Sequence, residues 1–225
     1  MTQASTTEPP DSAARPGPEL RVYLLLEDLQ RQFAAYLGTP SRARGYPPFE
    51  GQHSLIVEVA PGLAIERVID LALRAVPTVE PGILFVERQF GVLEVHGSDL
   101  ADVRRAGAAI LEGLGASAED QLRPRVLFTD VIEDVTDQHA VIINRNRQAS
   151  MLMPGQSLLV CEMTPALFAT AAANAAEKVT PGVTLVDVTM IGAAGRVYMS
   201  GATEDVLKAR AEIIRVLDSL EGREQ

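Results

Sequence analysis

The sequence contains two related copies of one segment: most of the segment repeats at an offset of 104 residues, and its first strand repeats at an offset of 106. Identical residues coincide at this offset, prolines and glycines among them: Leu55 with Leu159, Glu58 with Glu162, Pro61 with Pro165, Ala72 with Ala176, Gly91 with Gly195 and Gly97 with Gly201. Self-similarity at a fixed period indicates that a structural unit has been duplicated. We therefore predict two copies of one domain, the first over residues 19–118 and the second over residues 119–225.

The length and composition fit two soluble globular domains. The 225 residues leave about 100 residues for each copy, a size at which a single core is stable. Hydrophobic residues make up 47% of the chain and charged residues 22%, but only 4% are aromatic and there is no tryptophan. The cores are therefore expected to consist of Val, Ile, Leu and Ala side chains.

Charge and cysteine content exclude several classes of function. The net charge of −10 argues against a nucleic-acid partner and against docking on anionic membranes, because no basic surface can displace counterions. No apolar run is long enough to span a membrane, and the first twenty residues lack the features of a signal peptide. Cys161 is the only cysteine, which leaves no intramolecular disulfide. We expect a cytoplasmic protein.

The order of elements is the same in both copies. Residues 1–18 are rich in Pro, Ser, Thr and Ala and are expected to form a disordered tail. The pattern then predicts, in each copy, a strand with a short segment, followed by strand, helix, strand, strand and helix. The predicted strands lie at 19–26, 54–60, 82–88 and 91–96, and at 125–132, 157–163, 184–190 and 195–200; the helices lie at 63–75, 98–114, 166–178 and 203–220. This order is typical of an α/β (α+β) sandwich with one side of the sheet covered by helices.

Two kinds of local signal place the helix starts. Pro61 and Pro165 precede the first helix of each copy, and proline is well tolerated in a first helical turn. Ser98 with Asp99, and Thr203, are predicted to cap the second helix of each copy, each ahead of acidic residues that favour a helix N-terminus.

Several separated motifs resemble one known family. The matching segments are residues 34–39, 58–62, 86–91, 139–145, 173–178 and 192–196, and the likeness extends over residues 19–220. The chain resembles the circularly permuted, tandem-domain shell proteins of bacterial microcompartments, including carboxysomes. The resemblance implies two tandem shell domains, a homotrimer that mimics a hexamer, and tiling with other shell proteins into the facet of a compartment. It also implies a central pore for small metabolites and, in related members, stacking of two trimers as a dimer of trimers.

The predicted pore loops differ between the two copies. By resemblance, the loop formed by Glu87, Arg88, Gln89, Phe90 and Gly91 meets its symmetry mates at the pore. The second loop consists of smaller, uncharged residues: Ile191, Gly192, Ala193 and Ala194, where many members carry an aromatic residue in place of Ala194. On the residues alone, Glu87 and Arg88 are better explained as a solvated turn pair. With the resemblance, they predict a gate in which the charged loops pair across the axis or turn away into solvent.

Arg74 and Lys178 occupy the same place in the two copies, near the end of the first helix. The resemblance assigns this basic residue to the plate edge, where it packs against a neighbouring plate. A favourable interaction of a cation with the helix C-terminus would explain the same residues without any partner.

Catalytic, metal and cofactor sites are not predicted. His53, His96 and His139 show no ligand spacing with one another or with Cys161, which is expected to be a small core residue in a strand. Some tandem shell proteins bind an iron–sulfur cluster through pore cysteines, but neither pore loop contains cysteine. A trimeric regulatory protein that binds a small metabolite is the alternative reading, and an enzyme is the third.

Overall fold

The computed structural model describes residues 17–39 and 45–224, so most of the predicted tail lies outside the described residues. The first repeat contains these elements: β1 (Glu19–Leu26), α1 (Arg31–Leu37), β2 (His53–Ala60), η1 (Gly62–Ala64), α2 (Ile65–Ala75), β3 (Glu80–Val86), β4 (Gly91–Gly97) and α3 (Leu100–Leu114). After η2 (Ala118–Asp120), the second repeat contains β5 (Arg125–Ile132), α4 (Asp137–Asn146), β6 (Ser157–Thr164), η3 (Ala166–Phe168), α5 (Ala169–Val179), β7 (Thr184–Thr189), β8 (Gly195–Gly201) and α6 (Thr203–Ser219).

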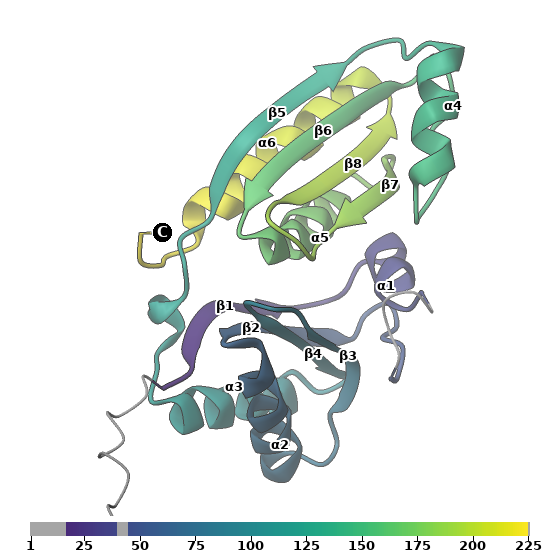
Figure 1. The fold of residues 1–225 in the computed structure, drawn as a ribbon. Coiled ribbons are helices and arrows are strands. Elements are labelled where there is room, and N and C mark those ends of the chain that lie inside the picture. Colours follow the sequence, from purple (N-terminus) through teal and green to yellow (C-terminus); the bar gives the residue numbers. More distant parts are fainter. Residues whose placement is uncertain (1–16, 40–44, 225) are drawn as a thin grey trace, which may run out of the picture.

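Each repeat forms one four-stranded antiparallel sheet, in the order β1-β2-β4-β3 and β5-β6-β8-β7. The two sheets share even their irregularities, because the first strand of each has a bulge at the same place, after Leu20 and after Val126. Two helices cover one side of each sheet, and the predicted α/β sandwich is confirmed (Figure 1). The two repeats thus share the same fold, including the register in which their strands pair.

The helices follow from the spacing of their apolar residues and from their caps. In α2 the buried residues Ile65, Val68 and Ala72 recur at helical spacing and pack on the sheet. The start of α3 is capped by Asp99, whose side chain accepts a hydrogen bond from the amide of Ala101. The predicted cap at Thr203 is wrong: Ala202 is the N-cap of α6, and the Thr203 hydroxyl pairs with that of Ser157.

The two prolines lie just before the predicted helix starts, but they do not occupy the first turn of an α-helix. Pro61 and Pro165 follow cis peptide bonds and precede the short 3-10 turns η1 and η3, after which α2 and α5 begin. The turn in each copy lies beside the β3–β4 or β7–β8 hairpin loop, which makes it part of the scaffold of the candidate site.

The two repeats are joined by packing the open side of the first sheet against helix α5 of the second repeat (Figure 1). One continuous core contains Val22 and Ile56 of the first sheet together with Leu167 and the alanines of α5. The smooth alanine face of α5 permits this close approach. The open side of the second sheet carries only α4, and it faces the viewer in Figure 1.

Candidate functional site

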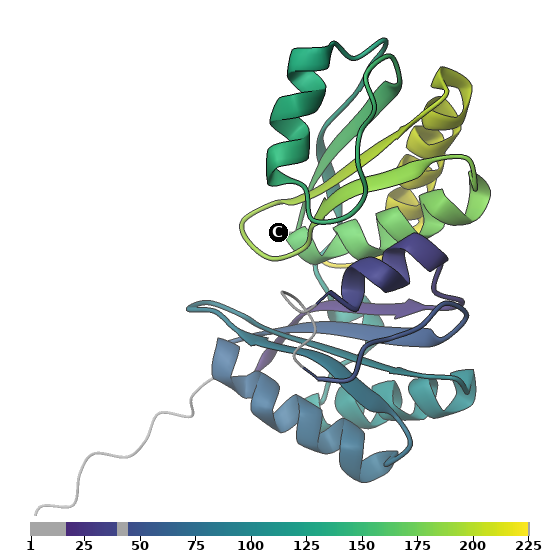
Figure 2. The same ribbon diagram turned by 90° about the vertical axis from the view of Figure 1, so that its right-hand side faces the viewer.

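The two predicted pore loops extend from the same side of the chain. The β3–β4 loop and the β7–β8 loop both lie on the left of the molecule in Figure 2, one from each repeat. Phe90 of the first loop and Ile191 of the second pack against the same hydrophobic core. The structure therefore brings the two sets of predicted loop residues to one region within a single chain.

Both loops are held against the proline-containing turn of their own repeat. The amide of Glu87 donates a hydrogen bond of 2.9 Å to the carbonyl of Phe90, which closes the first hairpin. A side chain at Gly91 would collide with the Gly62 carbonyl and with Ile65, and one at Gly195 would collide with the backbone of Ala166. The two glycines that coincide in the repeat are thus required for close backbone contact at the base of each loop.

The exposed tips of the loops differ in chemistry. Glu87, Arg88 and Gln89 are all exposed, and the Glu87 carboxylate accepts a hydrogen bond of 3.2 Å from the Arg88 amide. In the second loop, Gly192 has φ 134°, which favours glycine, and Ala193 is exposed beside the half-buried Ala194. One tip is charged and bulky, and the other is small and neutral.

Arg74 and Lys178 lie in the last turns of α2 and α5 and are both exposed. Arg74 Nε is 2.7 Å from Asp70 Oδ2 in its own helix, and this hydrogen bond holds the pKa of Asp70 below its usual value. Lys178 Nζ instead lies 3.3 Å from Asp28 Oδ2 of the first repeat. The two cations therefore occupy equivalent positions with different partners.

A polar network between the repeats was not foreseen from the sequence. The Glu177 carboxylate accepts hydrogen bonds from the amides of Gln32 (2.7 Å) and Phe33 (2.9 Å) at the start of α1. Asn174 Oδ1 accepts a third, from the Gln30 amide, at 2.8 Å. Helix α1 has no cap from its own side chains, so the second repeat caps it. The sequence did contain one signal of this network. At the offset of 104, the acidic Glu177 corresponds to the apolar Leu73, so the two copies differ in character at this position.

The α1 helix also satisfies the edge of strand β7. The Gln32 side chain donates to the Val183 carbonyl and accepts from the Leu185 amide, both at 2.9 Å. The Tyr36 hydroxyl donates to the Val188 carbonyl. These bonds cover an edge that would otherwise expose unpaired backbone groups.

The remaining polar candidates are buried within the repeats. His96 Nδ1 lies 3.2 Å from the carboxylate of Glu94, which also accepts a 2.6 Å hydrogen bond from the Ser54 hydroxyl. Cys161 is a buried strand residue, as predicted, and burial raises the pKa of its thiol to about 11. Within residues 17–39 and 45–224, no three His, Cys, Asp or Glu side chains are arranged to hold a metal ion.

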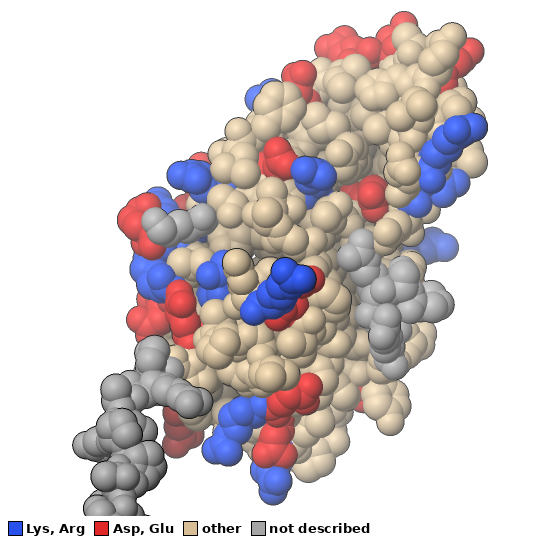
Figure 3. Space-filling model, viewed as in Figure 1, with Lys and Arg blue, Asp and Glu red and all other residues tan. Residues whose placement is uncertain are grey.

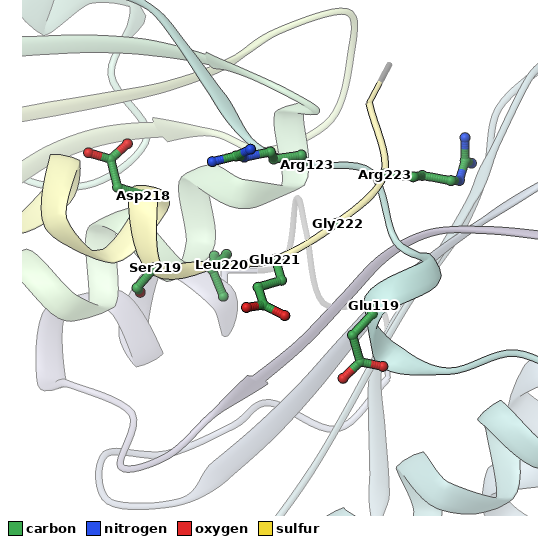
Figure 4. Close-up of a pocket in the computed structure, with 8 residues that line it drawn as sticks. All are labelled: Glu119, Arg123, Asp218, Ser219, Leu220, Glu221, Gly222 and Arg223. Carbon is green, nitrogen blue, oxygen red and sulfur yellow. The ribbon is translucent and has the colours of Figure 1, made fainter.

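A hollow of about 700 Å³ lies where the C-terminal segment returns to the linker between the repeats (Figure 4). Glu119 and Arg123 from the linker face residues Asp218–Arg223 across it. The side chain of Arg223 turns away from Asp218 and donates to the Asp120 carbonyl at 3.0 Å. Backbone bonds between Arg223 and Gln121 and between Arg123 and Arg223, both 2.8 Å, fasten this segment to the linker. The hollow thus lies between the linker and the C-terminal segment, and none of the predicted loop residues lines it.

Comparison with known proteins identifies the family. A family profile described as the CsoS1D N-terminal domain matches residues 20–120. The chain is 39% identical over 208 residues to the carboxysome shell protein CcmP of Synechococcus elongatus, covering 92% of this chain and 96% of CcmP. It is 41% identical over 203 residues to the carboxysome shell protein CsoS1D of Prochlorococcus marinus, covering 90% of this chain and 78% of that protein.

Solved structures agree with this relationship. The double-ringed trimeric shell protein MSM0271 from the RMM microcompartment is 70% identical, with a TM-score of 0.89 over 92% of this chain and all of that one. The fused permuted hexameric shell protein MSM0275 from the same microcompartment is 44% identical, with a TM-score of 0.86 over 91% of this chain and 99% of that one.

Among the described residues, no helix is long and apolar enough to cross a membrane. The duplicated sheets, the paired hairpin loops and these relatives lead to one conclusion: the chain belongs to the family of tandem, permuted microcompartment shell proteins that includes the carboxysome proteins CcmP and CsoS1D, and its role is structural.

Proposed function

We propose that three copies of this chain form a ring that mimics a hexamer, tiles into the facet of a microcompartment shell, and carries a gated central pore. The observation that carries the proposal is the position of the two hairpin loops on one side of the chain, against a common core. A threefold arrangement of such chains would gather six loops, three of each kind, around one axis. We assign no catalytic step to the chain.

The difference between the loops supports a gate. Three copies of Glu87 and Arg88 at one axis could pair across chains and close the opening, or turn outward into water and leave it open. Exposed ion pairs contribute only about 0–1 kcal/mol each, so neither state is strongly favoured and a small solute could shift the population. The small second loop, with Ala193 and Gly192, leaves room for the charged tips to move.

Stacking of rings is part of the same proposal. MSM0271 is a double-ringed trimer, and its chain is covered completely by the match to this one. We propose that two trimers of this chain also stack, enclosing a chamber between two pores. Metabolites would then pass two gates in succession.

The plate edge is assigned to Arg74 and Lys178. Both are exposed cations at the end of the helix that follows the proline turn, one in each repeat. Six such cations around a pseudohexamer would lie at six equivalent edges. We propose that they contact neighbouring plates.

Electron microscopy of purified protein tests the tiling role. The double substitution Arg74→Ala with Lys178→Ala removes both cations without placing a new acid beside Asp28 or Asp70. We expect rings of unchanged mass but no extended sheets. Arg105→Ala, which removes an exposed arginine on α3, is the matched control and should leave sheets intact. Sheets of normal extent in the double variant would overturn the assignment of these two residues.

A further inference from the structure

The segment that precedes the second strand of each sheet forms the same turn in both repeats. The two turns, at residues 49–52 and 153–156, coincide at the offset of 104, and we call them the apolar turns. Each presents a large apolar side chain to solvent: Phe49 is 65% exposed and Met153 is 51% exposed. Single exposed apolar residues are common on protein surfaces, but here one recurs at the same place in a duplicated turn. The recurrence indicates a role for this side chain in both repeats.

The exposed apolar surface extends to the residues just before each tip. Tyr46, three residues before Phe49, is 58% exposed, and Met151, two residues before Met153, is 51% exposed. Aromatic rings and thioethers are side chains that contribute strongly to contacts between proteins. Each repeat thus offers a partner two large apolar side chains at this place.

Four hydrogen bonds hold each apolar turn in a fixed shape. In the first repeat, the Gln52 side chain accepts from the Phe49 amide at 2.7 Å, and the Gln52 amide donates to the Phe49 carbonyl at 3.2 Å. Two backbone bonds join the turn to Leu29: the Gly51 amide donates to its carbonyl at 2.9 Å, and its amide donates to the Gln52 carbonyl at 2.8 Å. All four bonds recur in the turn at 153–156. Because the backbone is already ordered, a partner would meet a preformed surface.

Both apolar turns lie at the end of their sheet that is opposite the hairpin loop. Strand β2 begins directly after the first turn, and its first residue, His53, pairs with Gly97 at the end of β4. Gly91, at the hairpin, pairs with Val59 instead. At about 3.4 Å per residue, the two ends of the seven-residue strand β4 are about 20 Å apart. The second sheet has the same register, and in Figure 2 the first sheet extends from the β3–β4 loop on the left to the opposite strand ends on the right. Hairpin loops at the axis of a ring would therefore place the apolar turns at its perimeter.

The cations that we assign to the plate edge lie at this same end. Helices α2 and α5 carry Arg74 and Lys178 in their last turns and lead directly to β3 and β7, which begin at this end of their sheets. Lys178 also lies 3.3 Å from the carboxylate of Asp28, and the next residue, Leu29, is bonded to the first apolar turn. The apolar turn is thus continuous with the proposed plate edge.

Acidic side chains flank both apolar turns. Asp28 and Asp134 occupy equivalent places and both have a left-handed backbone, with φ 61° and 48°, which is uncommon for residues other than glycine. Each follows an exposed glutamate, Glu27 or Glu133. Figure 3 shows acidic side chains gathered at the upper end of the molecule, where β5 ends and α4 begins in Figure 1. An apolar tip beside acids is complementary in charge to an edge that carries cations.

We propose that the apolar turns anchor the plate edge, where Phe49 and Met153 pack against a second ring of the same chain. The acids beside each turn then face Arg74 and Lys178 of that ring. This inference rests on the proposed tiling and names its apolar contact. Because apolar tips, acids and cations all lie on one edge, two identical edges can meet about a twofold axis, each supplying acids to the other's cations.

Substitution of both tips tests the anchor by electron microscopy. Phe49→Ser with Met153→Ser should keep the circular dichroism spectrum and the ring mass of the wild type but lose extended sheets, since little apolar area is left to bury between rings. The exchange Phe49→Met with Met153→Phe keeps an apolar tip on each turn, so it is the matched control and should keep the sheets. Sheets of normal extent in the serine variant would overturn the inference. A fall in its mass from six chains to three would also overturn it, by placing the apolar turns between stacked rings.

A fluorescent label measures burial of the turn directly and separates the two failures. Phe49→Cys, labelled on a small fraction of chains with an environment-sensitive maleimide dye, should shift its emission to shorter wavelength when sheets form; Cys161 is buried and should not compete for the dye. Leu127→Cys, at a 46% exposed leucine near the hairpin end of the second sheet, is the control and should show no shift. Sheets that form without a shift at residue 49 contradict this contact but leave the tiling standing. A wild type that forms rings but no sheets contradicts the proposed tiling itself.

Discussion

Glu177 shows how a single difference between the repeats fixes their arrangement. Its carboxylate is 7% exposed and holds two amides of α1, which has no cap of its own. In the first repeat the equivalent residue is Leu73, and the counterpart of α1 in the second repeat, α4, is capped by its own residue Thr136. The Glu177 carboxylate therefore caps α1 through a contact between the two repeats, and the first repeat has no equivalent acid.

Replacement of Glu177 by the residue of the other copy should destabilise the fold. Glu177→Leu leaves the amides of Gln32 and Phe33 unpaired in a buried place, and each unsatisfied group costs about 1–3 kcal/mol. We expect the free energy of unfolding in urea, at fixed protein concentration, to fall by about 2–4 kcal/mol. Glu177→Gln keeps one acceptor oxygen and should lose about half as much. Equal stability of wild type and Glu177→Leu would show that α1 does not depend on this cap.

Cys161 should be unreactive in the folded chain. Its side chain is buried, and burial raises the pKa of its thiol to about 11, so at pH 8 only about one thiol in a thousand is ionised. Because the pKa is raised, reactivity should increase as the pH rises towards 11. We expect 5,5′-dithiobis(2-nitrobenzoate) to react within seconds in 8 M urea and only over hours in native buffer. Complete reaction of the native protein within minutes would contradict this burial.

At the scale of elements, the hairpin loops depend on close backbone contact with the proline turns. Gly91 abuts Gly62 and Ile65, and Gly195 abuts Ala166. The loop tips can vary in sequence because their bases are fixed. The position of each hairpin loop is thus set by its base, and the chemistry of the loop is set by its tip.

Addition of one methyl group at either loop base should be costly. Gly91→Ala and Gly195→Ala each place a Cβ in contact with backbone that cannot move freely, and such overpacking costs about 1–3 kcal/mol. Gly17→Ala, at a site with no neighbouring atoms within 4 Å, is the control and should be neutral. Thermal unfolding of the three variants measures the difference. Wild-type melting temperatures for Gly91→Ala and Gly195→Ala would show that the loop bases are not tightly packed.

Most helices and strands could be predicted, because the periodicity of apolar residues and the positions of proline and glycine indicate local structure. The offset of 104 located three of the four strand pairs and an offset of 106 located the first, β1 with β5, while Pro61 and Pro165 marked the turns before α2 and α5. The Thr203 cap was wrong because Thr203 lies one residue inside the helix, and its hydroxyl is engaged by Ser157. Helix α1 was not predicted, since its seven residues are stabilised by Glu177 and Asn174 from a distant part of the sequence.

At the scale of the whole molecule, duplication gives one fold two different hairpin loops. The sequence indicates which residues differ between the repeats, but burial decides what the differences mean. Leu63 and Leu167 are the same residue at equivalent positions, yet one is 74% exposed and the other fully buried. Only the packing of the repeats reveals this difference in burial. The plate-edge and gate roles likewise depend on other copies and remain predictions.

Cryo-electron microscopy of the purified protein tests the central claim most directly. The account predicts a threefold ring with pseudo-sixfold outline, in which the loops at residues 86–91 alternate with those at 190–195 around the axis. In wild type, the Glu87 and Arg88 tips should occupy both an open and a closed arrangement, whereas Arg88→Ala should leave only the open one. A ring whose 86–91 loops lie at the perimeter, away from the axis, would contradict the account.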